Sequence, residues 1–329
     1  MKALQLGVLS VSGFFQKKIA IPIAKSPLID IAAIASRSEE KAKTAAKTYN
    51  IGKAYGSYEA LLADQFIDAV YIPLPNHLHA QFIKKAADAG KHIICEKPLA
   101  LNADEAADAI SYAHKKGVKV MEAFMYRFHP QWQHARELIQ MKEIGKVHMV
   151  QCIFTYNNVD PSNIRNKPEA GGGAIMDIGC YAVSSSRFLI GSEPKRVISL
   201  SHYDQNFGTD ILSTGILDFG DSRAEYTVGT QTFPCQRVNV YGSGGTITIE
   251  IPFNTPSDVE TLITVTNSVG TREVLFAPED QYILEFEAFA QAIIEDTEVP
   301  TSPTDAIANM KVLDALIKSS QQNAWVQIK

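Results

Sequence analysis

The fold is indicated most clearly by residues 91–99, Lys91-His92-Ile93-Ile94-Cys95-Glu96-Lys97-Pro98-Leu99. A short apolar strand leads directly into a Glu-Lys pair, and Pro98 ends the strand because it has no backbone N–H to donate. Open α/β sheets bind ligands at the carboxyl ends of such strands, and burial can lower the pKa of a lysine by roughly 3–5 units. Lys97 is therefore a candidate proton donor and acceptor. The alternative for a lone lysine is a solvated charge at a strand end.

The first part of the chain alternates between short apolar segments and helical segments rich in alanine, lysine and glutamate. The expected strands are Leu4–Leu9, Ile29–Ala35, Ala69–Ile72, His92–Cys95 and Val118–Met121. The expected helices are Glu39–Tyr49, Tyr58–Leu62, Leu78–Ala89 and Asp104–Lys115, with Gly90 and Gly117 as C-terminal caps. Continuous apolar strands between helices indicate a parallel sheet covered on both faces. We expect a doubly wound Rossmann domain, class α/β, over residues 1–122.

After residue 122 the pattern changes to extended segments with partial alternation. Helices are expected at Trp132–Met141, after the glycines at 171–173, at Tyr282–Ile294 and at Thr304–Ser319. The expected strands are Val147–Tyr156, Arg196–Tyr203, Thr209–Phe219, Ala224–Thr232, Arg237–Tyr241, Thr246–Ile251, Glu260–Thr266 and Arg272–Phe276. Glycine-containing turns at 220–221 and 242–245 indicate hairpins. The pattern predicts an α+β domain over residues 123–329 with an open, mostly antiparallel sheet.

The composition is that of an ordinary globular protein. Of the 329 residues, 46% are hydrophobic and 20% charged, and the formal net charge of −5 argues against binding to nucleic-acid phosphates. The apolar N-terminal run is expected to be a strand and not a signal peptide, and no segment suits a membrane span. The four cysteines are widely spaced, and the His77-x-His79 pair has no neighbouring ligands. We expect no disulfide framework, no metal site and a cytoplasmic location.

The first strand-to-helix turn differs from the glycine fingerprint of dinucleotide sites. Where G-x-G-x-x-G is expected, the chain has Ser10-x-Ser12-x-x-Phe15, with Gly13 one position late. Small residues still let the backbone approach a pyrophosphate, and serine hydroxyls can donate hydrogen bonds to it. We expect Ser10, Ser12, Gly13 and Phe14 to belong to the cofactor site.

The end of the second strand indicates which nicotinamide cofactor the chain prefers. NAD-selective enzymes usually carry an acidic residue there, whereas this chain has Ala35-Ser36-Arg37. Ser36 and Arg37 suit a ribose 2′-phosphate, and charge-assisted bonds of roughly 1.5–3 kcal/mol correspond to about a ten- to hundredfold preference. We predict NADP(H), with NAD(H) as the alternative cofactor. The alternative role of Arg37 is to begin the next helix in solvent.

Residues 73–79, Pro73-Leu74-Pro75-Asn76-His77-Leu78-His79, follow another expected strand. Two prolines fix this loop, and Asn76 is expected to cap the following helix. A structural role and contact with the cofactor ribose explain the segment equally well. Its candidates for the cofactor site are Leu74, Pro75, Asn76 and His79.

Residues 171–181, Gly171-Gly172-Gly173-Ala174-Ile175-Met176-Asp177-Ile178-Gly179-Cys180-Tyr181, stand out in the second half. Three glycines give a backbone that can press against a ligand, and a helix is expected to begin after them. Asp177 and Tyr181 have the i, i+4 spacing that places two side chains on one helix face. A carboxylate and a phenol aimed at one point are suited to orienting a hydroxyl and handling its proton. The alternative is a helix face that is polar without a catalytic role.

Together these motifs resemble the glucose–fructose oxidoreductase, inositol dehydrogenase and MocA-type (Gfo/Idh/MocA) family over nearly the whole chain. The resemblance rests on the segments Ala35–Arg37, Pro73–Asn76, Glu96–Pro98, Glu122–Pro130, Asn163–Arg165 and Gly171–Tyr181. The most similar branch contains dimeric dihydrodiol dehydrogenases and NADP-linked D-xylose dehydrogenases. The resemblance implies that Lys97 and Tyr181 are the acid/base pair and that Asp177 assists, although other branches carry histidine at the Tyr181 position. It also implies substrate-side roles for Arg127, Asn163, Arg165 and Tyr282.

The expected activity is hydride transfer between a nicotinamide and a carbinol carbon of a sugar, polyol or cyclic diol. Lys97, helped by Tyr181, would move the hydroxyl proton, and Glu96, beside it in the cofactor site, would hold the lysine in place. Two alternatives use the same fold: a non-catalytic NADP-binding sugar sensor, and a glycosidase that uses oxidised cofactor transiently. We expect no nucleic-acid or membrane partner. The outer face of the antiparallel sheet could pair subunits, so a homodimer or homotetramer is expected.

Overall fold

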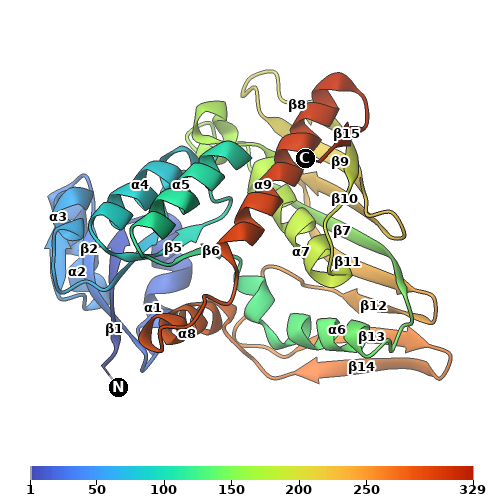
Figure 1. The fold of residues 1–329 in the computed structure, drawn as a ribbon, viewed down its shortest axis with the longest axis horizontal. Helices are drawn as coiled ribbons and strands as arrows, with labels where there is room; N and C mark the ends of the chain where they lie inside the picture. Colours follow the sequence, from blue (N-terminus) through green and yellow to red (C-terminus); the bar gives the residue numbers. More distant parts are fainter. Residues whose placement is uncertain (1, 329) are drawn as a thin grey trace. The chain divides into compact units, whose positions relative to one another are not determined.

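The computed structural model describes residues 2–328 and is drawn in Figure 1. The chain forms two compact units, one made of Met1–Met125 and Tyr282–Ile307 and the other of Tyr126–Gln281 and Ala308–Lys329. The sequence pattern predicts a single boundary at residues 122 and 123, so the structure differs by adding a segment near the C-terminus to the first unit. Over residues 2–328, no helix combines the length and the apolar character that crossing a membrane requires.

The first unit alternates strands and helices, as expected. Its strands are β1 (Leu4–Leu9), β2 (Ile29–Ala35), β3 (Lys53–Tyr55), β4 (Ala69–Ile72), β5 (His92–Glu96) and β6 (Val120–Ala123). Its helices are the π-helix η1 (Phe15–Ile19), α1 (Ala20–Ile23), α2 (Glu39–Tyr49), α3 (Tyr58–Leu62), α4 (Asn76–Asp88) and α5 (Ala103–Lys115). Gly90 and Gly117 follow α4 and α5 with φ of 69° and 71°, which confirms their role as C-terminal caps.

The strands of the first unit form one parallel sheet in the order β3-β2-β1-β4-β5-β6. This is the doubly wound order, which reverses direction between β1 and β4. The helices α4 and α5 lie side by side against it (Figure 1). Of the strands in this sheet, only the edge strand β3 was not predicted from the sequence, because residues 53–55 carry no apolar run. The predicted Rossmann sheet is confirmed.

Helix α8 (Gln281–Ile294) explains why the first unit gains a C-terminal segment. The ring of Phe286 packs edge-on against Tyr71 of β4, with centroids 5.0 Å apart. The hydroxyl of Ser26 donates a hydrogen bond of 2.7 Å to the carboxylate of Glu287. Phe286 and Tyr71 are both fully buried, so α8 completes the core of the parallel sheet. Sequence periodicity identified the helix but not the sheet on which it packs.

The second unit is built on a larger sheet. Its strands are β7 (Val147–Asn157), β8 (Arg196–Tyr203), β9 (Asp210–Asp218), β10 (Arg223–Gly229), β11 (Gln231–Gly242), β12 (Gly245–Ile249), β13 (Thr261–Asn267), β14 (Gly270–Phe276) and β15 (Val326–Gln327). The short helices are η2 (Met125–Phe128), η3 (Ile164–Asn166), η4 (Pro168–Ala170) and the π-helix η5 (Ile175–Gly179). The longer helices are α6 (Pro130–Gln140), α7 (Cys180–Ile190) and α9 (Pro303–Gln322), which begins in the first unit.

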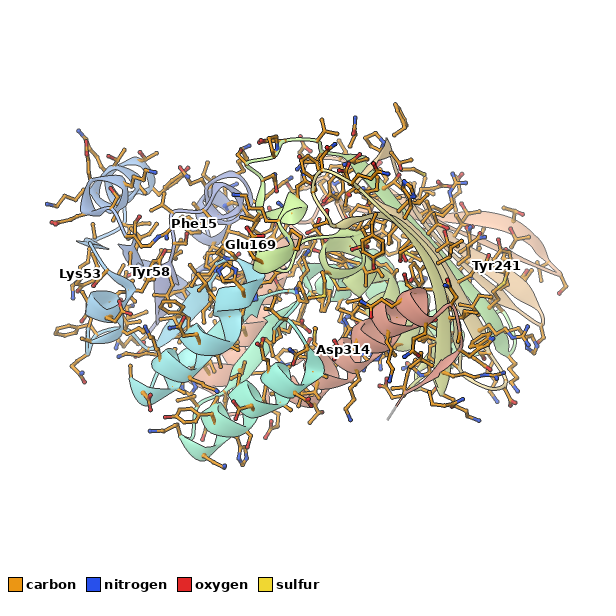
Figure 2. The ribbon with its side chains drawn as sticks, turned by 90° about the horizontal axis from the view of Figure 1, so that it is seen from above. Phe15, Lys53, Tyr58, Glu169, Tyr241 and Asp314 are labelled. Carbon is orange, nitrogen blue, oxygen red and sulfur yellow. The ribbon has the colours of Figure 1, made fainter. Side chains whose placement is uncertain are left out.

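This sheet has the order β14-β13-β12-β11-β7-β10-β9-β8-β15, and Figure 2 shows it from above with Tyr241 of β11 labelled. All its pairs are antiparallel except β7 with β10. The expected strand at Ala224–Thr232 is divided, because the chain turns between Gly229 and Gln231 and begins the long strand β11 there. The mostly antiparallel character is confirmed.

An aromatic cluster fills the space between this sheet and its helices. The ring of Phe253 packs on Trp132 of α6, Phe154 of β7 and Tyr181 of α7, with centroid separations of 5.8, 5.1 and 5.1 Å. Trp132 and Phe253 are fully buried. Such aromatic pairs contribute about 0.5–1.5 kcal/mol beyond the area they bury. The cluster therefore fixes the helix that carries Tyr181 on the sheet.

Candidate functional site

Lys97 lies directly after β5, between two buried anchors of the first unit. The backbone N–H of Leu99 donates 2.8 Å to Oε1 of Glu122 on β6. The carbonyl oxygen of Pro98 lies 2.9 Å from Nδ1 of His79. Glu122 and His79 are almost completely buried, whereas Lys97 is half-buried. The lysine therefore stands on a fixed backbone at the carboxyl end of the parallel sheet.

Glu96, which precedes this lysine, has a phenol and a second carboxyl group as neighbours. The phenol of Tyr71 donates a hydrogen bond of 2.6 Å to Oε1 of Glu96. Glu285 of α8 is fully buried, and its Oε1 has no hydrogen-bond partner among the described residues. Burial, reinforced by repulsion from Glu96, raises the pKa of Glu285 well above its usual value. Since two neighbouring carboxyl groups do not both ionise in a buried site, Glu285 is the protonated member of the pair.

The turn after β1 carries serines where dinucleotide-binding turns usually have glycines. Ser10 has a φ of 152°, a region that residues with a Cβ rarely adopt. The hydroxyl of Ser12 accepts a hydrogen bond of 3.1 Å from the N–H of Phe15 and so caps the helical segment that begins at Gly13. A Cβ on Gly13 would meet no atom, so Gly13 is not required by packing. Phe14 packs edge-on against Tyr282, at 5.7 Å between centroids.

The carboxyl ends of β2 and β4 carry the other expected cofactor residues. Ser36 is buried and its hydroxyl accepts from the N–H of Ser38, whereas Arg37 is exposed just before α2. The cap of α4 differs from expectation: Pro75 is the N-cap residue and Asn76 is the first residue of the helix, so the expected Asn76 cap is wrong. The carbonyl of Leu74 lies 2.8 Å from Nε2 of His79, which places His79 beneath the loop with no exposed surface.

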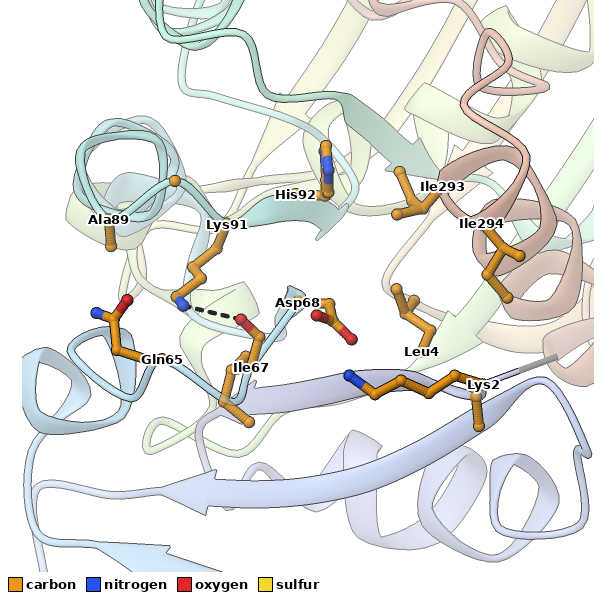
Figure 3. A pocket seen from close by; sticks show the side chains of 12 residues that line it. Lys2, Leu4, Gln65, Ile67, Asp68, Ala89, Lys91, His92, Ile293 and Ile294 are labelled. Carbon is orange, nitrogen blue, oxygen red and sulfur yellow. Dashed lines mark hydrogen bonds between the residues drawn. The ribbon is translucent and has the colours of Figure 1, made fainter.

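The opposite edge of the sheet holds an open depression of about 480 Å³, shown in Figure 3. It lies at the amino-terminal ends of β1, β4 and β5. Lys91 points toward its rim, but its ammonium group donates to the carbonyl oxygens of Asp64 and Ile67, each at 2.8 Å. Burial lowers the pKa of Lys91. This lysine therefore stabilises the backbone between Asp64 and Ile67. Within residues 2–328, no cluster of His, Cys, Asp and Glu side chains suits a metal ion.

In the second unit, Asp177 is the centre of a charged network. Oδ2 of Asp177 accepts 2.6 Å from the phenol of Tyr156 and 2.9 Å from Nε of Arg165. The carboxylate of Asp177 raises the pKa of Arg165, and burial, followed by the same carboxylate, raises the pKa of Tyr156. Tyr156 therefore stays a neutral donor and Arg165 a cation. Asp177 is an oriented carboxylate in a site that is mostly buried.

Tyr181 lies one turn beyond Asp177, at the start of α7. It is 6% exposed, and its ring packs on Phe154 and Phe253 in the aromatic cluster. Arg165 interacts electrostatically with both Asp177 and Tyr181. The structure therefore brings Arg165, Asp177 and Tyr181 together within the second unit.

Asp210 at the start of β9 explains the glycine run. Its Oδ2 accepts 2.7 Å from the N–H of Ile175 at the beginning of η5. A Cβ on Gly173, whose φ is 111°, would overlap Oδ1 of Asp210, and one on Gly172 would overlap the carbonyl of Arg165. The glycines therefore let the backbone pack against Asp210 and Arg165, two groups of the same unit.

The remaining expected substrate residues have different surroundings. Arg127 is buried, and its guanidinium donates 2.7 Å to the hydroxyl of Ser184. Asn163 caps η3, with Oδ1 accepting from the N–H of Arg165. Tyr282 belongs to the first unit, where it packs on Phe14. Asn163 thus holds the backbone at Arg165, whereas Arg127 links η2 to α7.

Sequence reasoning missed Tyr71, Tyr156 and Asp210 as site residues. Tyr71 and Tyr156 lie at strand ends beside Glu96 and Asp177, but an isolated tyrosine in an apolar strand gives no signal of its own. Asp210 lies far from Gly173 in sequence. Only the sheet register brings such residues to the groups that they contact.

The first unit has a parallel dinucleotide-type sheet with a lysine at its carboxyl edge. The second unit has an open, mostly antiparallel sheet and carries a carboxylate and a phenol. This combination is typical of a class of two-domain oxidoreductases. Residues 5–124 match the model of an oxidoreductase family with an NAD-binding Rossmann fold, and residues 132–248 match a GFO/IDH/MocA C-terminal domain. The chain belongs to the Gfo/Idh/MocA family of NAD(P)-binding oxidoreductases.

Several relatives in this family are dehydrogenases or reductases. A D-xylose 1-dehydrogenase (NADP(+)) from Haloferax volcanii is 39% identical over 99% of this chain and 100% of its own. A trans-1,2-dihydrobenzene-1,2-diol dehydrogenase from Xenopus tropicalis is 33% identical over 75% of this chain and 76% of its own. The crystal structure of a 3-ketoreductase from Actinomadura kijaniata with NADP and TDP-benzene superposes with a TM-score of 0.91 at 25% identity, covering 97% of this chain and 98% of that one.

Proposed function

We propose that this chain catalyses reversible hydride transfer between NADP(H) and a CH–OH carbon of a sugar, polyol or cyclic diol. The observation that carries the proposal is the placement of Lys97 at the carboxyl end of β5, on a backbone fixed by Glu122 and His79. Ligands of doubly wound sheets bind at this edge. When bound, the nicotinamide supplies or accepts the hydride.

The residues around the first turn fit a dinucleotide. The N-terminus of the helix after Ser12 is suited to a pyrophosphate, since the first turn of a helix carries the positive end of the helix dipole. Ser10 holds the backbone in a conformation typical of the glycines that such turns use. Arg37 is exposed beside the end of β2, where it would bind a 2′-phosphate. We propose NADP(H) as the preferred cofactor, which agrees with the NADP named for two relatives.

The proton of the substrate hydroxyl would be moved by Lys97 together with Tyr181. A cationic Lys97 also stabilises the negative charge that develops on the substrate oxygen. Asp177 would orient the hydroxyl, because Tyr156 and Arg165 hold one of its oxygens in place. Glu96, which accepts from Tyr71, would hold the lysine at the edge of the sheet.

The substrate class follows from the relatives, whose names include a D-xylose dehydrogenase and a dihydrodiol dehydrogenase. The test is a spectrophotometric panel of aldoses, polyols and cyclic diols with NADP and with NAD. Steady NADPH formation with at least one free sugar or diol is the expected result. If no member of the panel reduces either cofactor while the protein binds it, the proposed reaction is wrong, and a sugar sensor or a glycosidase becomes the better reading.

We further propose a homodimer or homotetramer formed through the outer face of the second sheet. Leu200 on β8 and Leu212 and Ile216 on β9 expose 70%, 41% and 38% of their surfaces. The registers place all three on one face of neighbouring antiparallel strands. An exposed apolar face of this kind suits pairing with a second copy. Sedimentation at a monomer's mass would contradict the proposal.

A cytoplasmic location is proposed from the four free cysteines.

A further inference from the structure

His79 lies beneath two loops of the first unit at once. Its side chain is fully buried, with Nδ1 at 2.9 Å from the carbonyl oxygen of Pro98 and Nε2 at 2.8 Å from that of Leu74. Leu74 belongs to the loop after β4, and Pro98 follows Lys97 after β5. Since β4 and β5 are neighbours in the sheet, one ring contacts both loops at adjacent strand ends.

The two contacts have a definite chemistry. A backbone carbonyl oxygen only accepts hydrogen bonds, so the ring must be the donor in either contact. Burial lowers the pKa of His79 to about 4, outweighing the two carbonyls, which favour the charged ring. The ring is therefore neutral near pH 7, and its single N–H alternates between two tautomers, one donating to the carbonyl of Pro98 and the other to that of Leu74. Each nitrogen serves a different loop.

We infer that His79 is a positioning residue that sets the backbone of Leu74 in the cofactor loop and the backbone of Pro98 beside the catalytic lysine. This inference rests on the proposed NADP(H)-dependent activity and identifies a buried group that supports it. It replaces the direct cofactor contact expected from the sequence, because the ring of His79 has no exposed surface. Cofactor affinity and turnover would thus depend on different atoms of one side chain.

Three substitutions separate the two contacts. The amide nitrogen of asparagine lies as many bonds from Cα as Nδ1 does, so His79→Asn keeps the donor toward Pro98. The amide nitrogen of glutamine corresponds in the same way to Nε2, so His79→Gln keeps the donor toward Leu74. His79→Leu retains bulk and removes both donors. Each amide variant therefore reproduces one of the two neutral forms of the ring.

The expected result is a split between binding and turnover. His79→Asn should keep kcat at saturating NADPH within about twofold of wild type and raise the Kd of NADPH roughly tenfold. His79→Gln should do the reverse, with a near-normal Kd and a roughly tenfold lower kcat. Kd is measured by the fluorescence of NADPH on binding, and kcat with the best substrate of the panel.

Two controls accompany these variants. His77 lies in the same first turn of α4 but is exposed, so His77→Asn and His77→Gln should leave both quantities unchanged. Thermal unfolding shows which variants fold. If His79→Leu does not fold, the comparison of His79→Asn with His79→Gln still decides. Hydrogen exchange of residues 72–76 and 96–100 reports on each loop without reference to catalysis.

The inference is overturned if His79→Asn and His79→Gln affect Kd and kcat alike, or if both match wild type in these quantities. A wild-type protein that binds no NADPH would instead contradict the proposed function. In that case hydrogen exchange still tests whether His79 holds the two loops. His79→Asn should loosen residues 72–76 alone, and His79→Gln should loosen residues 96–100 alone. Equal loosening of both loops by both variants would show that the ring only fills space.

Discussion

Tyr156 and Asp177 are joined by a hydrogen bond of 2.6 Å from the phenol to Oδ2 of the carboxylate. The two residues come from β7 and η5, and Arg165 donates to the same oxygen. The carboxylate is therefore held from two sides, which orients its remaining acceptor positions. This relationship makes Tyr156 a positioning residue for Asp177 in the proposed reaction.

Tyr156→Phe should lower kcat/KM by roughly 10- to 100-fold, because a hydrogen bond to a charged group contributes about 1.5–3 kcal/mol. Steady-state kinetics with the best substrate of the panel measure the change. Tyr241→Phe is the matched control, since Tyr241 lies on β11 in a half-exposed position away from this network. A Tyr156→Phe protein that folds and retains wild-type kcat/KM would show that Asp177 needs no such support.

Asp210 predicts a characteristic pH dependence of stability. Burial raises the pKa of Asp210 from 3.8 to about 6, so between these values the folded state binds more protons than the unfolded state. The stabilising contribution of this group is complete below pH 4 and is lost as the pH rises through 6. Asp210→Asn removes the titration.

The free energy of unfolding of Asp210→Asn, relative to wild type, should therefore shift in favour of the variant between pH 4 and pH 7, by up to about 3 kcal/mol. Urea unfolding at the two pH values measures the shift. The quantity compared is the difference in the free energy of unfolding between wild type and variant, taken at pH 4 and again at pH 7. A loss of the hydrogen bond to Ile175 contributes equally at both pH values and therefore cancels. A difference that does not vary with pH would mean that Asp210 does not titrate in this range.

Ser10 and Ser12 should respond to substitution in opposite directions. Ser10→Gly should stabilise the protein by about 1 kcal/mol, because a φ of 152° is costly for a residue with a Cβ. Ser12→Ala should destabilise it by about 1 kcal/mol through loss of the helix cap. Thermal unfolding measures both, and neither substitution should abolish NADPH binding. A destabilised Ser10→Gly variant would mean that the hydroxyl of Ser10 matters more than its backbone.

Arg37→Ala should remove most of the preference for NADP. In the wild type, KM for NADP should be about ten- to hundredfold lower than KM for NAD. The variant should raise KM for NADP toward that of NAD and leave KM for NAD nearly unchanged, because only the 2′-phosphate needs the guanidinium. Equal KM values for the two cofactors in the wild type would show that Arg37 faces solvent without a ligand.

Much of the fold could be predicted from the sequence because its signals are local. The bounds of β1, β2, β4, α2 and α3 agree with the expected segments, since each is a continuous apolar or helical run between turn residues. The placement of α8 on the parallel sheet could not be predicted, because it depends on the contact between Phe286 and Tyr71. These two residues are far apart in the sequence.

The candidate site was predictable only where chemistry and spacing coincide. Lys97 follows an apolar strand, and Asp177 and Tyr181 have helical spacing, so both signals are local. The partners that orient them are not: His79, Glu122, Tyr156 and Asp210 reach these groups through sheet register and loop packing. The glycine run illustrates the difference, because Gly173 accommodates the carboxylate of Asp210, a residue far from it in the sequence.

The most direct test of the proposed reaction is the Lys97→Met protein. It should bind NADPH with nearly wild-type affinity, measured by fluorescence. Its kcat with the best substrate should fall by roughly 10²–10⁴-fold, the usual cost of losing a positioned acid/base group. A Lys97→Met protein with near-normal kcat would contradict the assignment of Lys97 as the group that moves the hydroxyl proton.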